Sequence, residues 1–116
     1  MRHRNKGKIL DRKKDSRQAL LRGLATNLVL YEKIKTTEAK AKALKPIIER
    51  LITKGKAKDL KSRRELLTYL YLKNAVKKVL EELSPRYKDR KGGYTRIIKI
   101  GTRQGDAAKI VQIEFV

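Results

Sequence analysis

Positive charge dominates this chain more than any other feature, and it limits how far the chain can compact on its own. Lysine and arginine contribute 32 residues against 12 aspartates and glutamates, a formal net charge of +20 over 116 residues. An excess of this size repels itself within a compact fold. Because neutralising phosphates releases condensed counterions and yields a large binding free energy, we expect nucleic acid to be the partner.

The remaining composition allows a small folded body. A chain of this length predicts one domain that buries roughly two-thirds of the surface its unfolded form exposes. Cysteine is absent, which excludes disulfides and thiolate metal sites. No apolar run approaches the roughly 18 residues of a membrane span, and the basic start leads into no apolar signal region. We therefore expect a cytoplasmic protein.

Residues 1–14 are expected to form a basic N-terminal arm, followed by a single α+β domain over residues 15–116. The arm has too few apolar residues to order itself by burial. Its cations are Arg2, Arg4, Lys6, Lys8, Arg12, Lys13 and Lys14. We expect the arm to become fixed on its partner, with His3 contacting a phosphate or a base.

Apolar residues at helical spacing predict two long helices. The first covers Ser16–Leu30 and is opened by a capping box at Asp15–Gln18. The second covers Glu38–Lys54, where Pro46 is expected to cause a kink or a break because proline lacks the N–H of the helical ladder. Gly55 is expected to end it.

Two shorter helices are predicted between the long helices and the C-terminal strands. Ser62 is expected to cap the first, with four residues facing the core: Leu66, Leu67, Leu70 and Tyr71. Asn74 is expected to cap the second, and Ser84–Pro85 to close it.

Three segments rich in β-branched and aromatic residues predict strands, namely Tyr31–Thr37, Tyr94–Ile100 and Ile110–Val116. The last two read as a hairpin, which needs a third strand for stability. The predicted architecture is therefore α+β, with helices packed on one face of a small, mainly antiparallel three-stranded sheet.

Catalytic chemistry has little support in the sequence. His3 is the sole histidine and lies in the predicted arm, so we expect no histidine metal cluster and no Ser-His-Asp set in the rest of the chain. Asp106 lies in a predicted turn, where a lone carboxylate usually accepts local hydrogen bonds. We expect no enzyme activity, no metal, no cofactor and no small-molecule substrate.

Basic side chains outside the arm gather in two groups, which we predict to contact nucleic acid. The loop group contains Arg86, Lys88, Arg90 and Lys91, and the hairpin group contains Arg96, Lys99 and Arg103. Arginine is favoured for ordered contacts, because its planar fork can hold a phosphate with two hydrogen bonds. Arg86 and Arg90 are expected to be exposed contacts that matter little for stability.

Two tyrosines and two glycines flank the basic loop. Tyr87 and Tyr94 could stack on unpaired bases, although core packing is an equally good interpretation for Tyr94. Gly92 and Gly93 lack side chains, so their backbone could approach a phosphate or adopt a positive φ.

The basic loop, the hairpin and the arm together favour binding to RNA with an irregular surface. The alternative is a DNA-binding, nucleoid-type architectural protein, but no helix concentrates the basic residues that would read a major groove.

Several segments, in this order and spacing, resemble the bacterial large-subunit ribosomal protein seventeen family over essentially the whole chain. They are Met1–Arg4, Arg17–Ala19, Ile34–Thr37, Lys40–Lys42, Pro85–Arg86, Gly92–Ile97, Arg103–Asp106 and Ile113–Glu114. The resemblance implies an α+β structural protein bound to large-subunit rRNA, beside other ribosomal proteins near the outer end of the peptide exit tunnel. It also implies that some residues contact rRNA or shape the surface that binds it, namely Met1–Arg4, Arg17, Lys35, Arg86 and Gly92–Arg96.

Overall fold

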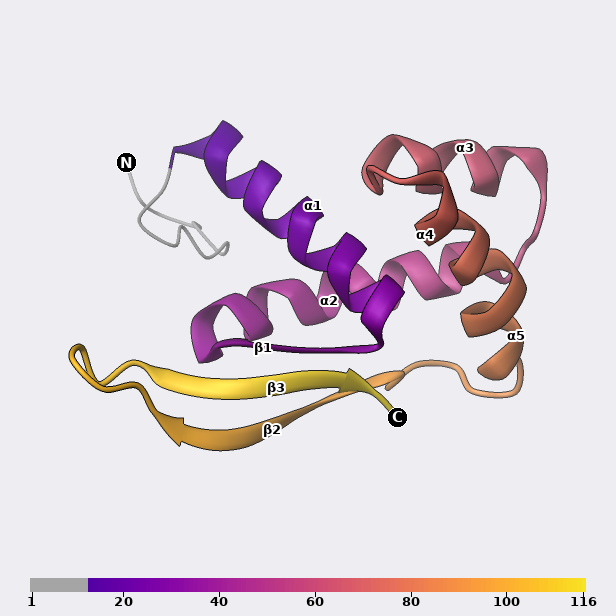
Figure 1. The fold of residues 1–116 in the computed structure, drawn as a ribbon. Coiled ribbons are helices and arrows are strands. Elements are labelled where there is room, and N and C mark those ends of the chain that lie inside the picture. The colour runs from indigo at the N-terminus through magenta and orange to yellow at the C-terminus, as the bar shows by residue number, and fades with distance from the viewer. Residues whose placement is uncertain (1–12) are drawn as a thin grey trace, which may run out of the picture.

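The computed structural model describes residues 13–116, which form two layers: a three-stranded sheet and a set of helices that covers one of its faces (Figure 1). The predicted α+β class and the one-sided packing of helices are confirmed. The predicted arm contacts Arg2, His3, Arg4, Lys6, Lys8 and Arg12 lie outside the described residues.

The sheet consists of β1 (Lys33–Thr37), β2 (Thr95–Thr102) and β3 (Lys109–Phe115). Their order is β1-β3-β2, and both pairings are antiparallel. The hairpin prediction is confirmed, as is the recruitment of the strand around Ile34, which pairs with Ile113. A bulge between Lys99 and Gly101 shifts the register near the hairpin end.

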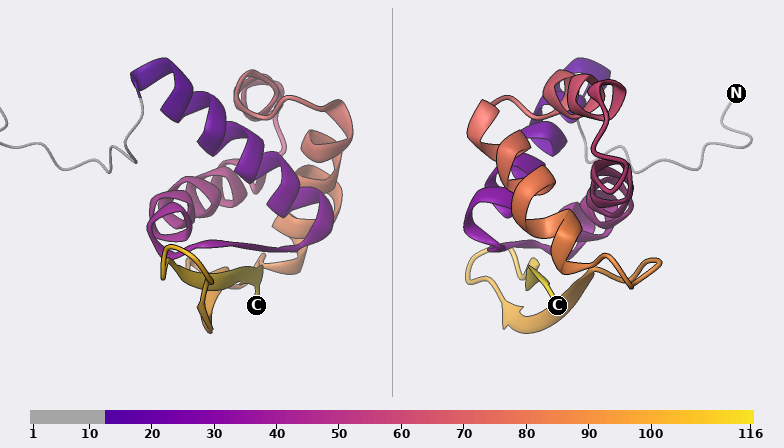
Figure 2. Two further views of the ribbon diagram at one scale, coloured as in Figure 1. Left: turned by 60° about the vertical axis from the view of Figure 1, so that its left-hand side comes forward. Right: turned by 90° about the vertical axis from the view of Figure 1, so that its right-hand side faces the viewer.

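The two faces of the sheet differ in their surroundings. Val111, Ile113 and Phe115 of β3 are buried beneath the helices, whereas Gln112 and Glu114 alternate with them and point to the other side. No helix of the described chain covers that second face in any of the views (Figures 1 and 2). The predicted alternation of a buried and a wet face is confirmed.

α1 spans Lys14–Tyr31, which is longer at both ends than predicted. The capping box at Asp15–Gln18 is wrong, because Lys13 holds the N-cap position without a side-chain bond and Asp15 already lies in the first turn. At the other end Tyr31 is still helical, so the strand predicted to begin there starts at Lys33. Glu32 reverses the chain between them with φ 64°, the left-handed conformation common at helix ends.

α2 spans Glu38–Gly55 and continues through Pro46, so the predicted break is wrong. Apolar residues on both sides of the proline lie on one buried stripe and pack both halves against the core. The stripe consists of Ala41, Leu44, Ile48, Leu51 and Ile52. Proline removes the hydrogen bond to the carbonyl four residues earlier, and both residues concerned, Lys42 and Pro46, are exposed.

α3 spans Leu60–Tyr69 and is capped by Asp59, whose carboxylate accepts the Ser62 N–H at 2.7 Å. The predicted cap at Ser62 is therefore wrong, because Ser62 lies inside the first turn of α3 and donates its backbone N–H to the capping residue Asp59. Leu66 and Leu70 are buried as predicted, whereas Leu67 and Tyr71 are exposed.

The last helical region combines α4 (Lys73–Lys78), a π-helical turn η1 (Val79–Leu83) and α5 (Ser84–Arg86). The predicted cap at Asn74 is wrong, since the helix begins one residue earlier and Leu72 is the N-cap. Helical structure also continues past Ser84–Pro85. Ser84 remains helical because its buried hydroxyl donates to the Ile52 carbonyl at 3.0 Å, which anchors this turn on α2.

A single apolar cluster joins the helices to the inner face of the sheet. Its fully buried larger members are Tyr94, Leu28, Leu44, Ile48, Ile52, Leu66, Leu70, Leu83, Ile113, Val29, Val79 and Val111. Among the described residues, no helix combines the length and apolarity that crossing a membrane requires.

Candidate nucleic-acid interface

The loop of residues 87–94 presents Lys88, Arg90 and Lys91 as exposed side chains. Its backbone is held in place from within: Lys56 Nζ donates to the Arg90 carbonyl, and Arg90 Nη1 donates to the Gly93 carbonyl at 3.2 Å. The loop is thus a preformed support for three cations that α5 and β2 fix at both ends.

Gly93 adopts φ 64°, which confirms the second of the two uses predicted for this glycine. Its N–H donates to Glu49 Oε1 of α2 at 2.8 Å, and Glu49 Oε2 accepts from Thr95 Oγ1 at 3.4 Å. A phosphate at the Gly93 amide would have to displace this carboxylate. The amide therefore shapes the loop, and Glu49 is the anchor that sequence reasoning missed.

The tyrosines beside the loop belong to the core, so base stacking by Tyr87 and Tyr94 is wrong. Their side chains are 4% and 0% exposed. Their ring centroids are 5.2 Å apart, and Tyr87 also packs on Phe115 at 6.3 Å. Each hydroxyl bonds within the protein: Tyr87 donates to the Val116 carbonyl at 2.7 Å, and Tyr94 lies 3.2 Å from Thr53 Oγ1.

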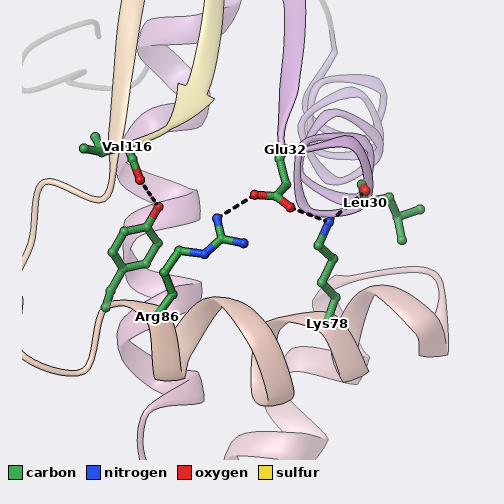
Figure 3. Close-up of polar contacts among 6 residues, drawn as sticks. Leu30, Glu32, Lys78, Arg86 and Val116 are labelled. Atoms are coloured by element: carbon green, nitrogen blue, oxygen red, sulfur yellow. Dashed lines mark hydrogen bonds and ion pairs between the residues drawn. The ribbon is translucent and has the colours of Figure 1, made fainter.

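Arg86 takes part in an intramolecular ion-pair cluster at the surface. Its Nη1 contacts Glu32 Oε1 at 2.5 Å, and Lys78 Nζ contacts Glu32 Oε2 at 3.1 Å, as Figure 3 shows. Lys78 also donates to the Leu30 carbonyl at 3.0 Å. The hydrogen bond from Arg86 is the main reason why the pKa of Glu32 falls to about 2, and the same pairing raises the pKa of Arg86.

This cluster changes the interpretation of Arg86. It ties α5 to the junction between α1 and β1, where Glu32 reverses the chain. Arg86 is exposed, as expected, but its guanidinium also holds the Glu32 carboxylate, which the sequence did not predict. Unlike that of Arg86, the side chain of Arg90 bonds only within its own loop among the described residues, and it stays on the surface.

The hairpin end is organised by Arg103 and Asp106. Arg103 Nη2 contacts Asp106 Oδ2 at 2.5 Å, and Asp106 Oδ1 accepts the Ala108 N–H at 3.2 Å. These bonds lower the pKa of Asp106 to about 2, with the Arg103 bond the larger cause. The predicted role of Asp106 as a local acceptor is confirmed, and Arg103 stiffens the turn from an exposed position.

On the sheet, Arg96 of β2 contacts Glu114 of β3 at 3.3 Å and keeps an exposed side chain. Lys35 of β1 is exposed on the same face. Lys33 shares this face but was not predicted; the two-residue period of a strand is the signal that would have identified it. The face thus gathers basic residues from both outer strands.

Pairing cannot neutralise the chain. The ion pairs among residues 13–116 engage Lys42, Lys54, Lys78, Arg86, Arg96 and Arg103. Within this part of the chain, several predicted contacts have no such pair: Lys13, Arg17, Lys35, Lys88, Arg90 and Lys91. These cations remain available to an external anion.

A cavity of about 490 Å³ lies between α1, α2 and α3, with Leu21, Ile47 and Leu51 among its lining residues and Arg22, Arg50 and Lys54 as its cations. The part of the chain that the structure describes contributes no carboxylate and no histidine to this lining, so it holds no general acid or base pair. Across residues 13–116, no cluster of histidine, cysteine, aspartate or glutamate has the composition of a metal site.

The fold and its surfaces define a class: a small basic α+β protein whose rigid body carries exposed cations in a loop, on a hairpin and across a sheet face. Residues 20–116 match the family model described as "Ribosomal protein L17". The chain belongs to the ribosomal protein L17 family.

Curated relatives agree over nearly the full length. The "Large ribosomal subunit protein bL17" of a Hydrogenobaculum species is 51% identical, with 100% of this chain and 99% of the relative covered. The protein of the same name from Rickettsia typhi is 53% identical over 100% of this chain and 85% of its own length. That of an Exiguobacterium species is 49% identical over 92% and 96%. None of these names supports the DNA-binding alternative.

Proposed function

We propose that this chain is a structural component of the large ribosomal subunit, which it joins by binding rRNA. The main support is the match to large-subunit proteins along the whole chain, at 49–53% identity. The formal net charge of +20 gives the physical reason, because phosphates can supply the charge that intramolecular pairs cannot.

Three groups of cations make the proposed contacts. The first is the N-terminal arm through Lys13, continued by Arg17 on α1. The second is the rigid loop with Lys88, Arg90 and Lys91. The third is the sheet and hairpin, with Lys35, Arg96 and Arg103. Arg86, Gly92, Gly93 and Tyr94 support these contacts by shaping the RNA-binding surface: Arg86 bonds to Glu32, the Gly93 N–H bonds to Glu49, and Tyr94 is buried in the core.

The remaining parts of the proposal concern the surroundings of the chain. We place it in the cytoplasm within the ribosome, next to other large-subunit proteins near the outer end of the exit tunnel, as the family resemblance implies. Its role is to order RNA structure, without catalysis, a cofactor or a small-molecule substrate.

Sedimentation of cell extract through a density gradient in high salt tests this function. The chain is expected to travel with large ribosomal subunits, because a built-in component stays in the assembled particle, whereas a chain held only by non-specific attraction between exposed charges is released as salt screens them. Recovery only at the top of the gradient, or with the chromosome, would contradict the proposal. In vitro, folded rRNA should compete for the purified chain better than duplex DNA; the opposite order would favour the nucleoid alternative.

A further inference from the structure

The face of the sheet opposite the helices carries an ordered charge pattern. Side chains that point to this face come from every second residue of each strand. The register places Lys33, Glu114 and Arg96 in one row across the sheet, and Lys35, Gln112 and Ile98 in the next. Each row begins on β1, crosses the central strand β3 and ends on β2.

Hydrogen-bond acceptors occupy the centre of this face, and cations occupy its flanks. Gln112 Nε2 donates to Glu114 Oε1 at 3.1 Å, so the amide oxygen of Gln112 and the second carboxylate oxygen of Glu114, which Arg96 contacts, lie along the middle of the face. Arg96 reaches that second oxygen from β2 at 3.3 Å, while Lys33 and Lys35 are exposed on β1. A ligand that fits would present donors in its middle and anionic groups along both borders.

Apolar surface adjoins these polar groups on the outer strand β2. Ile98 is 41% exposed, and it neighbours Gln112 in the register. The outward positions of the strands hold no aromatic residue: Tyr94 and Phe115 are buried on the helix side or beside it. The face therefore lacks the platforms on which single-stranded bases stack, but it offers a surface against which sugars can pack.

We propose that this face binds the minor groove of duplex RNA. An A-form duplex has a wide, shallow minor groove that displays 2′-hydroxyls and base edges between two phosphate backbones. In this arrangement Gln112 and Glu114 accept from 2′-hydroxyls or exocyclic amines, Ile98 packs against riboses, and the cations of β1 and β2 reach the two backbones. This inference rests on the proposed function and names the RNA form that the sheet recognises.

The dimensions favour RNA over DNA. Adjacent strands are about 4.8 Å apart, so the three strands span about 10 Å before their side chains extend. The minor groove of B-form DNA is only about 6 Å wide and lacks the 2′-hydroxyl. A carboxylate at the centre of a phosphate-binding face would be unfavourable against a purely anionic surface, whereas between two backbones it meets hydroxyl donors.

Competition binding with the full chain tests the inference. The probe is an RNA duplex of about 16 base pairs, and the competitors are the DNA duplex of the same sequence and single-stranded RNA of equal length. We expect duplex RNA to win over both. Gln112→Val keeps a residue that suits a strand, and it should reduce the preference for RNA over DNA by about tenfold.

The flanking cations have a matched control. Removing both lysines of β1 (Lys33→Ala with Lys35→Ala) should weaken duplex RNA binding. The slope of log binding constant against log salt concentration should become shallower by about 2. Removing Lys73 and Lys77 of α4 deletes the same charge from exposed positions on the opposite layer, and it should have a smaller effect. Equal losses in the two double variants, or DNA competing as well as RNA, would overturn the inference.

A second measurement identifies what covers the face in the assembled subunit. A photocrosslinking residue introduced at Ile98 should label RNA, and a crosslink to a neighbouring protein would overturn the inference. Thermal melts check that each variant folds. If the wild-type chain sediments with large subunits but the variants of the sheet face bind RNA as well as the Lys73 and Lys77 control does, only this inference fails. If the wild-type chain does not sediment with large subunits, the proposed function fails.

Discussion

Single residues at the junction between α1 and β1 carry more of the structure than their surface position indicates. Glu32 adopts a left-handed conformation, accepts from Arg86 and Lys78, and offers its carbonyl to the Phe115 N–H at 3.1 Å. One residue thereby connects the first helix, the last helical segment and the end of the sheet.

The Glu32 cluster predicts a defined pH dependence. The pKa of Glu32 is lowered from 4.5 to about 2 in the fold, so its contribution to stability is complete above pH 4.5 and disappears as the pH falls towards 2. Glu32→Gln should lose about 1 kcal/mol or less at neutral pH, because the paired side chains are 37% and 39% exposed. Chemical denaturation from pH 2 to pH 7 should show the two proteins converging at low pH; a constant difference would contradict the assignment.

The residue scale is also where sequence reasoning was weakest. Arg86 meets a carboxylate 54 positions earlier in the chain, and the Tyr94 hydroxyl meets Thr53, 41 positions earlier. Local composition marks a residue as basic or aromatic, but it cannot show whether a distant segment has already taken its side chain. Asp106 was predicted correctly because both of its partners lie within three residues.

At the scale of elements, α2 packs tightly against η1 and α5 at Gly55. A Cβ added to Gly55 would overlap Ser84 Oγ and lie 2.8 Å from Val79 Cγ1. Ser84 cannot easily yield, because its hydroxyl is buried and bonded to the Ile52 carbonyl. The glycine is therefore required by packing, not only by the end of the helix.

Gly55→Ala should reduce the free energy of unfolding by about 1–3 kcal/mol, the range for overpacking. Gly23→Ala is the matched control: Gly23 lies inside α1, and an added Cβ would have nothing within 4 Å. That variant should gain about 0.5–1 kcal/mol from improved helix propensity. Urea denaturation of both proteins measures the difference, and a Gly55 variant as stable as the wild type would show that the contact relaxes.

The elements themselves were largely predictable, and their ends were not. Apolar spacing located the helices because burial of a stripe decides whether a helix forms. Caps were poor guides: Lys13 and Leu72 hold N-cap positions without a side-chain bond, whereas Asp59 caps a helix predicted to start later. Pro46 also shows that packing outweighs local preference, because buried residues on both sides of it maintain α2 through a residue that disfavours a helix.

At the scale of the whole molecule, rigidity and charge are separated in space. The apolar cluster joins α1, α2, α3, α4 and η1 to the sheet, while the loop, the hairpin and the bare face of the sheet present cations to solvent. The sequence predicted this division, because charge and apolar periodicity occupy different segments. It could not predict which side of the sheet stays bare, since that depends on how β1, β2 and the helices assemble.

This separation predicts that the N-terminal segment contributes to RNA binding but not to folding. Deleting residues 1–12 removes five of the 32 cations and leaves α1, which begins at Lys14, intact. Affinity for folded rRNA should fall, and the salt slope should drop by about 0.7–0.9 for each phosphate that is no longer neutralised. The melting temperature and the circular dichroism of the domain should stay close to those of the full chain. If unfolding became easier while RNA affinity held, the segment would belong to the folded body, and the cations of loop and sheet would have to account for binding alone.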